Sequence, residues 1–465
     1  MPNTKSPTKT DYAHVQTADL RYVWHHLTQH KKFDNAPPPV FTDSDGMYVW
    51  DSDGNKYLDC VAGGLWTVSI GYGRASVADA VRDQLVKLNF QSPTTANAPT
   101  ALFAEKLLEK MPNMARLYLA TSGSEANEKA YKMVRQLAKR KHGGEKYKIL
   151  YRERDYHGTT IAALASCGQS ERRGEYGPMP PGFVEIPHCL HYRSQWGDMD
   201  SDTYAQKSVD AIEAIIKHEG ANTIGSLVLE TITAGGGVIV PPPNYWQYIQ
   251  DLCQQHNILL HLDEVVCGFG RLGTWFGYEH FAIKPDFVTM GKGIASGYAS
   301  LAGLATTEEV FEAFKSDPDD AMSCFRDIST YAGCLSGPAA ALENMRIMED
   351  ENLVDNSREV GGYLHQKLAP LADKHEVIGE IRGMGLLAGI ELVADRKKKT
   401  PMAEAQVQAV LAHAKTNGVL LGATNRSIAG FNNTLILSPA LICTKREVDI
   451  MVAAIDAGLT AVFSQ

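Results

Sequence analysis

The sequence has few of the features that mark secreted, metal-binding or nucleic-acid-binding proteins. Its eight cysteines include no CxxC pair and lack the spacing of a small disulfide-linked domain, so we expect reduced thiols and no metal site. The formal net charge is −9, and the nearest thing to a basic cluster is the short run from Arg396 to Lys399. A solvated loop explains that run, and nucleic acid is therefore not an expected partner.

Long apolar segments are missing as well. The N-terminal segment MPNTKSPTKTDYAHVQ lacks the apolar centre of a signal peptide, and no later stretch approaches the roughly 18 apolar residues of a membrane span. We therefore expect no membrane contact and a cytoplasmic location. What is present is a chain of 465 residues with 44% hydrophobic content, enough for about two or three domains with large cores.

The central part of the chain alternates between two kinds of pattern. Between residues 102 and 305, helical patterns at 102–110, 125–140, 208–219 and 246–256 are interleaved with β-rich runs at 116–120, 148–152 and 226–230. This alternation predicts an α/β fold, with a largely parallel sheet covered by helices on both faces.

The two ends of the chain have different patterns. Near the N-terminus we expect a helix around 19–29 and a hairpin whose turn is Asp53-Gly54. After Gly333 a long helix, a strand punctuated by glycines at 381–393 and further short elements predict a smaller α+β domain.

Polar side chains follow the ends of several expected strands. Ser122, His157, Glu230, Asp263 and Lys292 all stand just beyond, or at the end of, such apolar runs. Because open α/β sheets bind ligands at the carboxyl ends of their strands, we expect these side chains to share one rim.

One of these positions is suited to an anion. Ser122 and Glu125 have the spacing of a capping box, and the helix that follows begins directly after a strand. A well-capped helix is the simpler interpretation, but the unpaired N–H groups of its first turn also favour phosphate.

Two other phosphate motifs fit poorly. A Walker loop needs Ser or Thr after Gly-Lys, whereas Gly293 follows Gly291-Lys292. Gly268, Gly270 and Gly273 match GxGxxG, but the run is separated from its strand and no acidic strand end follows at the expected distance. A turn is the expected role of these glycines, and a nicotinamide-dependent dehydrogenase is disfavoured.

Lys292 and Asp263 together indicate the cofactor chemistry. A lysine between two glycines beyond an apolar strand is expected to be partly desolvated, which favours the free amine that forms an imine. Asp263 can keep a pyridine nitrogen protonated, Tyr156 and Val265 can pack on the two faces of the ring, and residues 121–124 can hold a phosphate. These are the parts that pyridoxal 5′-phosphate requires.

The motifs SGSEANE, YHGTT, LDEV, the GKG lysine and DISTYAG occur in the order seen in class III aminotransferases, which the chain resembles from about residue 20 to its C-terminus. The resemblance implies pyridoxal-phosphate-dependent transferase fold type I, with a mainly parallel seven-stranded sheet. It also implies a division into 1–61 (arm and part of the small domain), 62–333 (large domain) and 334–465 (small domain).

The resemblance assigns roles to individual residues. Lys292 would carry the cofactor and move protons, Asp263 would pair with the pyridine nitrogen, and Thr330 would reach the phosphate of a neighbouring subunit. It thus implies a homodimer, or a tetramer, with active sites at the interface. The full set of implied cofactor contacts is Ser122, Gly123, Ser124, Tyr156, His157, Glu230, Asp263, Val265, Lys292 and Thr330.

Substrate contacts are expected from three places. Gly235 stands where ornithine- and aminobutyrate-type members carry a glutamate, and segment 63–73 resembles the pocket of members that use pyruvate, with Leu65 and Trp66 as walls. The arginine that usually precedes the LSP strand is missing, and Arg426 in a longer loop is the candidate replacement for binding a carboxylate.

Further runs, among them YRERDYHGTT, CGFGRLGTWFGY and FRDISTYAGC, resemble class III members that transfer the amino group of taurine to pyruvate. A broad amine–pyruvate or β-alanine–pyruvate aminotransferase is the alternative enzyme, since one such pocket can accept several small primary amines. A catalytically silent scaffold is disfavoured because both Lys292 and Asp263 are present.

Overall fold

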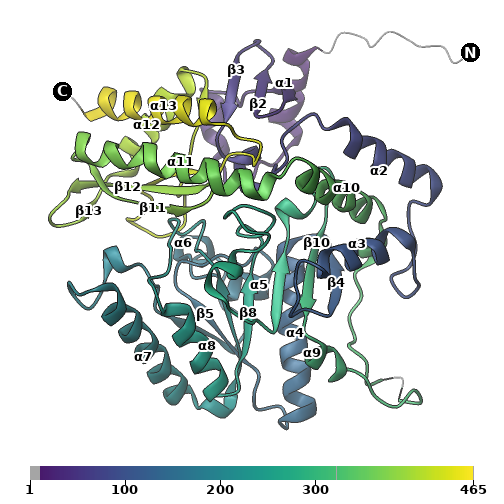
Figure 1. Ribbon diagram of the computed structural model, residues 1–465. Helices are drawn as coiled ribbons and strands as arrows, with labels where there is room; N and C mark the ends of the chain where they lie inside the picture. The colour runs from purple at the N-terminus through teal and green to yellow at the C-terminus, as the bar shows by residue number, and fades with distance from the viewer. Residues whose placement is uncertain (1–10, 321, 464–465) are drawn as a thin grey trace, which may run out of the picture.

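The computed structural model describes residues 11–320 and 322–463, which form three sheets and their covering helices (Figure 1). The largest sheet has seven strands, and only β10 runs antiparallel to its neighbours. In spatial order the strands are β4 (Arg116–Ala120), β10 (Ala302–Thr306), β9 (Phe287–Met290), β8 (Leu259–Asp263), β7 (Ile224–Glu230), β5 (Lys148–Arg152) and β6 (Phe183–Ile186). The mainly parallel seven-stranded sheet is confirmed.

The middle strands are buried along nearly their whole length because helices cover both faces. All seven residues of β7 are buried, and so are all four of β9. Helix α4 packs on one face, while α7 and α8 pack together on the other (Figure 1). The helices of this part are α3 (Ala98–Leu108), α4 (Gly123–Lys141), α5 (Ile161–Ala165), α6 (Ser170–Arg173), α7 (Ser201–Glu219), α8 (Tyr245–Gln255) and α9 (Glu308–Glu312).

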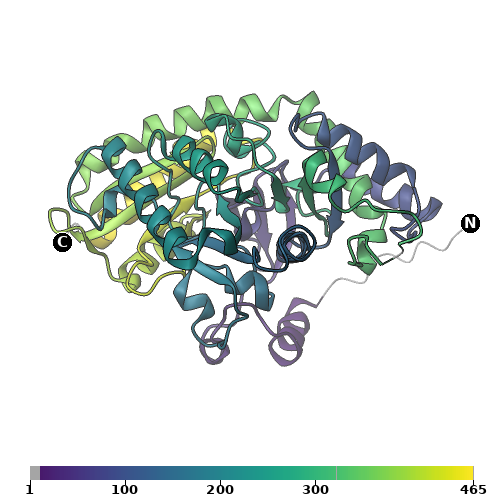
Figure 2. The ribbon, with the colours of Figure 1, turned by 90° about the horizontal axis from the view of Figure 1, so that it is seen from below.

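The helix predicted near the N-terminus differs from the one in the structure. Helix α1 covers Tyr12–Tyr22, capped by Asp11, and the predicted helix at 19–29 is wrong beyond Tyr22. The chain turns there because the N–H of His25 donates to the ring of His30, 3.0 Å away, instead of to a helical carbonyl. Figure 2 shows α1 at the lower edge of the molecule, projecting from the rest, and none of its residues is buried.

A small sheet joins the two ends of the chain. The predicted hairpin at Asp53-Gly54 is confirmed as β2 and β3, and the C-terminal strand β14 pairs in parallel with β3. The elements are β1 (Phe41–Asp45), β2 (Tyr48–Asp51), β3 (Lys56–Asp59), β14 (Val419–Leu420) and, beyond them, helix α2 (Ala75–Lys87).

The third sheet corrects a second prediction. The single strand expected at 381–393 is a hairpin, because Gly385 takes φ +55°, a left-handed conformation that reverses the chain between β11 and β12. The division at residues 61 and 333 stays a prediction. The elements are α10 (Ser336–Asp350), α11 (Leu353–Lys374), β11 (Ile378–Met384), β12 (Leu387–Asp395), β13 (Thr400–Pro401), α12 (Glu404–Thr416), β15 (Gly422–Ala423), β16 (Thr434–Leu437) and α13 (Lys445–Phe463).

Among the residues that the structure describes, no helix is both long and apolar enough to cross a membrane. The predicted turn at Gly268 to Gly273 is confirmed, since this run forms turns and Gly270 and Gly273 both take positive φ.

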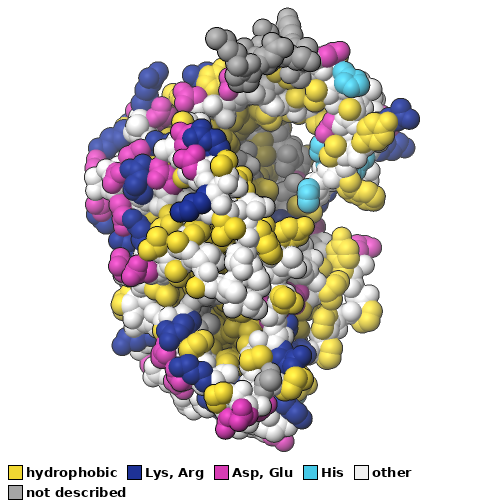
Figure 3. Space-filling model, turned by 90° about the vertical axis from the view of Figure 1, so that its right-hand side faces the viewer, with side chains coloured by type: hydrophobic (Ala, Val, Ile, Leu, Met, Phe, Trp, Pro, Cys, Tyr) yellow, Lys and Arg dark blue, Asp and Glu magenta, His cyan; other side chains and the backbone are white. Residues whose placement is uncertain are grey.

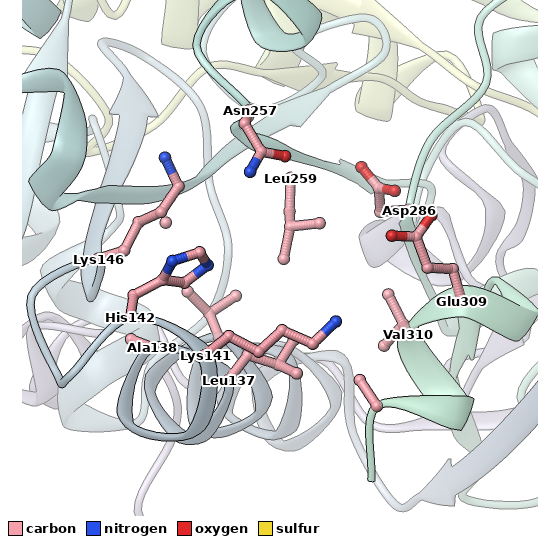
Figure 4. Close-up of a pocket in the computed structure, with 13 residues that line it drawn as sticks. Leu137, Ala138, Lys141, His142, Lys146, Asn257, Leu259, Asp286, Glu309 and Val310 are labelled. Carbon is pink, nitrogen blue, oxygen red and sulfur yellow. The ribbon is translucent and has the colours of Figure 1, made fainter.

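A cavity of about 140 Å³ lies at the amino ends of the parallel strands, the edge opposite to the predicted rim. Figure 4 shows Asp286 and Glu309 on one side of it and His142 and Lys146 on the other. The carboxylate of Asp286 accepts a hydrogen bond of 2.8 Å from the N–H of Leu260. Burial, with a smaller effect of Glu309, raises the pKa of Asp286 to about 6.

We expect Asp286→Asn to stabilise the protein in a pH-dependent way. The folded carboxyl holds its proton up to about pH 6 and the unfolded one only to about pH 4, so wild-type stability falls as the pH rises through this window. At pH 7.5 the asparagine variant avoids roughly 1–3 kcal/mol of this cost, and at pH 5 about half of it. Thermal unfolding of both proteins at the two pH values measures the difference; an equal gain at both contradicts this assignment.

Candidate active site

The carboxyl ends of four parallel strands bring the predicted residues to one rim. Asp263 is the last residue of β8 and Glu230 the last of β7, side by side in register. His157 follows β5, and Lys292 follows β9 after one glycine. The predicted common rim is therefore present.

The start of α4 forms the first part of the site. Ser122 caps the helix, since its Oγ accepts from the N–H of Glu125 at 3.2 Å. A β-carbon at Gly123 would lie 2.9 Å from Cγ2 of Val265, so only glycine lets this turn approach the loop after β8 so closely. The Glu125 carboxylate accepts from both the N–H and the hydroxyl of Thr121, each at 2.8 Å.

A second close approach joins this turn to the segment after β5. Oγ of Ser124 accepts from the N–H of Thr159 at 3.1 Å. Gly158 has φ +140°, and a β-carbon there would lie 2.4 Å from that same oxygen. The two segments thus form one wall, held by a glycine on each side.

Asp263 is buried and fully oriented. Its Oδ2 accepts from Nδ2 of Asn127 and lies 2.9 Å from Nδ1 of His157, and its Oδ1 accepts from the N–H of Val265 at 3.0 Å. Burial alone would raise the pKa of Asp263, but His157, Asn127 and the Val265 N–H outweigh it and lower the pKa. The carboxylate is therefore ionised at neutral pH.

Asn127 was not singled out in the sequence. It is completely buried, and its side-chain amide also donates to the carbonyl of His157 at 2.7 Å, so it joins α4 to the segment after β5. The only available signal was a polar residue beside the apolar stripe of its helix. This signal is weak, because no pattern around Asn127 predicts that its side chain is buried.

Lys292 has an unusual backbone and a perturbed amine. Its φ is +44°, a left-handed conformation that costs a non-glycine residue of order 1–3 kcal/mol. Burial lowers the pKa of its amine, and the charges of Glu230 and Asp263 only partly oppose this. Nζ lies 4.8 Å from the centre of the Trp66 ring. The site therefore favours an unprotonated amine facing Trp66.

Glu230 lies beside these groups. Its carboxylate accepts from the N–H of Tyr156 at 2.8 Å and from the N–H of Ala234 at 3.0 Å. Burial, reinforced by the charges of Asp155 and Asp263, raises the pKa of Glu230 well above its usual range. Glu230 thus positions the Tyr156 backbone. The raised pKa favours the protonated, neutral form of the Glu230 carboxyl group.

A buried ion pair supports Glu230 from behind. Arg152 and Asp155 are completely buried and 3.1 Å apart. Arg152 donates to the carbonyl of Glu230 at 2.6 Å, and the Asp155 carboxylate accepts from the N–H of Glu230 at 2.9 Å. Both backbone groups of the strand end are thereby held.

The predicted substrate residues differ in their contacts and in their exposure. Trp66, with φ +59°, packs against Lys292, and its buried Nε1–H has no acceptor within the described part of the chain. Leu65 is 66% exposed. Arg426 donates from Nη1 to the carbonyl of Leu27 in the N-terminal segment. Thr330 is exposed and begins a short turn after Ser329, whose hydroxyl donates to Glu125.

The arrangement fits pyridoxal phosphate. Gly123 and Gly158 remove the β-carbons that would fill the cradle at the start of α4, where backbone donors suit a phosphate. Asp263 is the ionised group that a pyridinium nitrogen requires, and Lys292 supplies the amine for an aldehyde. Among the described residues, no group of three or more acidic, histidine or cysteine side chains is placed to bind a metal ion.

Comparisons with known proteins agree with this geometry. The family model described as aminotransferase class-III matches residues 30–459. A hypotaurine/taurine–pyruvate aminotransferase of Paracoccus denitrificans (strain Pd 1222) is 58% identical over 454 residues, which cover 98% of each chain.

Two solved structures share the fold over nearly the whole chain. An aminotransferase of Bacillus anthracis has a TM-score of 0.92 at 34% identity, over 98% of this chain and 100% of that one. An ω-transaminase of Pseudomonas jessenii in complex with PMP has a TM-score of 0.92 at 31% identity, over 97% of this chain and 98% of that one. The chain belongs to the class III aminotransferase family, whose members are pyridoxal-phosphate-dependent enzymes.

Proposed function

We propose that this aminotransferase transfers the amino group of taurine to pyruvate, forming sulfoacetaldehyde and alanine. The observation that carries the proposal is the 58% identity, over 98% of both chains, with the relative from Paracoccus denitrificans that is named for hypotaurine, taurine and pyruvate. The two substrates react in turn at one site, so the pocket must accept a short amine with a terminal anion and a small keto acid.

Lys292 and Asp263 have separate roles in the reaction. Pyridoxal phosphate, when bound, supplies an aldehyde for the amine and a ring that withdraws electrons from the carbon bearing nitrogen. Nζ of Lys292, with its lowered pKa, would take the proton from that carbon and deliver it to the exocyclic carbon of the cofactor. Asp263 keeps the ring nitrogen protonated through its buried, ionised carboxylate.

The remaining contacts position the cofactor. Ser122, Gly123 and Ser124 at the start of α4 would hold the phosphate, and Val265 and Tyr156 would pack on the two faces of the ring. His157 orients Asp263, and Glu230 holds the Tyr156 backbone.

The substrate side is formed by other residues. Trp66, which packs against Lys292, and Leu65 would wall the pocket, and Arg426, in the loop that contacts the N-terminal segment, would bind the carboxylate of pyruvate.

The same proposal includes a homodimer in which Thr330 reaches the partner's phosphate. Hydrophobic side chains gather on the face shown in Figure 3, where α2 lies. Exposed hydrophobic side chains of this kind usually mark an interface. A dimer mass in sedimentation equilibrium is expected, and a monomer mass contradicts this part. Large exposed residues of α2 and of the segments around 65 and 330 are Leu65, Leu85, Val86, Ile328 and Tyr331.

The test is the visible absorbance of the purified, cofactor-loaded protein. Taurine should bleach the band of the bound aldehyde form, and pyruvate added after removal of taurine should restore it, because the amino group passes through the cofactor in two half-reactions. Sulfoacetaldehyde and alanine should appear in equal amounts. If only other amines bleach the band, the enzyme keeps its class but taurine is not the donor.

A further inference from the structure

Arg172 lies beside the reacting groups, although nothing in its sequence context marks it. Its guanidinium carbon is 5.1 Å from the centre of the Tyr156 ring. Its charge is also one of the influences that lower the pKa of Lys292, after the larger effect of burial. Arg172 therefore stands near both the proposed ring-stacking residue and the amine that handles the proton.

Two hydrogen bonds hold Arg172 in place without neutralising it. Nε donates to Oε1 of Gln169 at 2.6 Å, and Nη2 donates to the carbonyl of Asn425 at 3.3 Å. Both acceptors are uncharged. Gln169 is itself completely buried and donates to the carbonyl of Arg154 at 3.0 Å. The guanidinium is thus oriented before any ligand arrives, which reduces the entropy lost on binding.

No carboxylate pairs with Arg172 within the described residues 11–320 and 322–463, and its Nη1 has no acceptor there. The adjacent Glu171 is occupied, since its carboxylate accepts from Nδ2 of Asn432 at 2.9 Å. An arginine left without a counter-ion beside a reaction centre is suited to an anionic ligand.

Gly235 explains why the site has no acidic partner. A β-carbon there would lie 3.1 Å from Nε2 of Gln169 and 3.6 Å from Cη2 of Trp66, so a longer side chain would have to displace one of them. Gln169, Gly235 and Trp66 therefore line one continuous wall from Arg172 to Lys292, whose Nζ faces the Trp66 ring. The unpaired Nε1–H of Trp66 is a second buried donor on this wall.

From this geometry we infer that Arg172 binds the terminal anionic group of the amine donor, and that Arg426 does not. The ligand class is a short primary amine with a sulfonate or carboxylate two carbons away. Arg172 is a specificity-determining residue, since it binds the end of the substrate and takes no part in proton transfer. The inference rests on the proposed function for the choice of taurine, but extends to β-alanine, which has the same chain length.

The test compares three donors in Arg172→Gln and wild-type holoenzyme. Taurine and β-alanine carry an anion, and n-propylamine has a methyl group in its place. The half-reaction, followed by the cofactor absorbance, gives an apparent Kd and a limiting rate for each donor. We expect Kd for both anionic donors to rise about 10- to 100-fold with little change in limiting rate, since a charge-assisted hydrogen bond is lost. Kd for n-propylamine should change by less than about threefold by the same reasoning.

Arg173→Gln is the matched control, because the neighbouring Arg173 contacts Tyr151 and the carbonyl of Cys167 away from Lys292. An unchanged Kd for the anionic donors in Arg172→Gln overturns the inference. Equal losses for all three donors overturn it too, since they indicate a structural role. A rise in these Kd values in Arg426→Gln instead assigns the anion to Arg426. If wild type reacts with β-alanine but not with taurine, the proposed donor is wrong while Arg172 is still judged on β-alanine.

Discussion

Replacing Lys292 by alanine is expected to lower the rate of amino transfer by about 10⁴-fold, because the variant loses both the amine that carries the cofactor and the group that moves the proton. Borohydride reduction should attach the cofactor covalently to wild-type protein and not to the variant. The measurements are kcat with the best amine donor and the intact mass after reduction. Activity within tenfold of wild type would falsify the assignment of Lys292.

The backbone at Lys292 allows chemistry and stability to be separated. At φ +44° alanine retains the steric cost of the left-handed conformation, whereas glycine does not. Lys292→Gly should therefore be as inactive as Lys292→Ala. Its free energy of unfolding should equal that of Lys292→Ala or exceed it by up to about 1 kcal/mol. The exposed Lys284 provides the control, since Lys284→Ala removes a lysine from the same region of the chain without touching the site. Thermal unfolding and kcat of Lys292→Ala, Lys292→Gly and Lys284→Ala separate the effect of losing the amine from the effect on stability.

The sheet could be predicted where local signals were complete. The run 116–120 became β4 with the same bounds, and Asp53-Gly54 gave the hairpin β2–β3, because short apolar runs bounded by turn residues have few other ways to fold. The hairpin β11–β12 was missed because its apolar pattern continues through the turn. Only the left-handed conformation of Gly385 separates the two strands, and periodicity does not report it.

The residues of the site, too, could be predicted from the sequence only where a local signal was present. Residues at strand ends could be grouped because parallel strands end at one edge, which is a rule of topology. Asn127 and Arg172 are not at strand ends. Asn127 acts through a contact to Asp263, 136 positions along the chain, and Arg172 lies in a run of charged residues typical of a solvated surface. Long-range packing alone brings them to the rim, so their positions required the three-dimensional structure.

Replacing Asp263 by asparagine is expected to lower kcat by about 10²- to 10³-fold, because the buried negative charge that stabilises the protonated ring nitrogen is lost. The amide keeps the size of the carboxylate, and its oxygen can still accept from Asn127 and His157. Its NH₂ group would then face the N–H of Val265, which now bonds to Oδ1, so some loss of stability accompanies the change.

Charge and packing can be told apart by the cofactor itself. A pyridoxal phosphate methylated on the ring nitrogen carries a permanent positive charge, so it should restore much of the activity of Asp263→Asn if the carboxylate serves only to maintain that charge. Asp286→Asn is the control for losing a partly buried carboxylate, since Asp286 lies at the opposite edge of the sheet and touches no part of the site. No recovery with the methylated cofactor, together with a lowered unfolding temperature, would mean that Asp263 acts by holding His157 and Asn127 in place. Recovery with the methylated cofactor, despite the stability lost at the Val265 contact, would instead identify the negative charge of Asp263 as the catalytic contribution of this strand end.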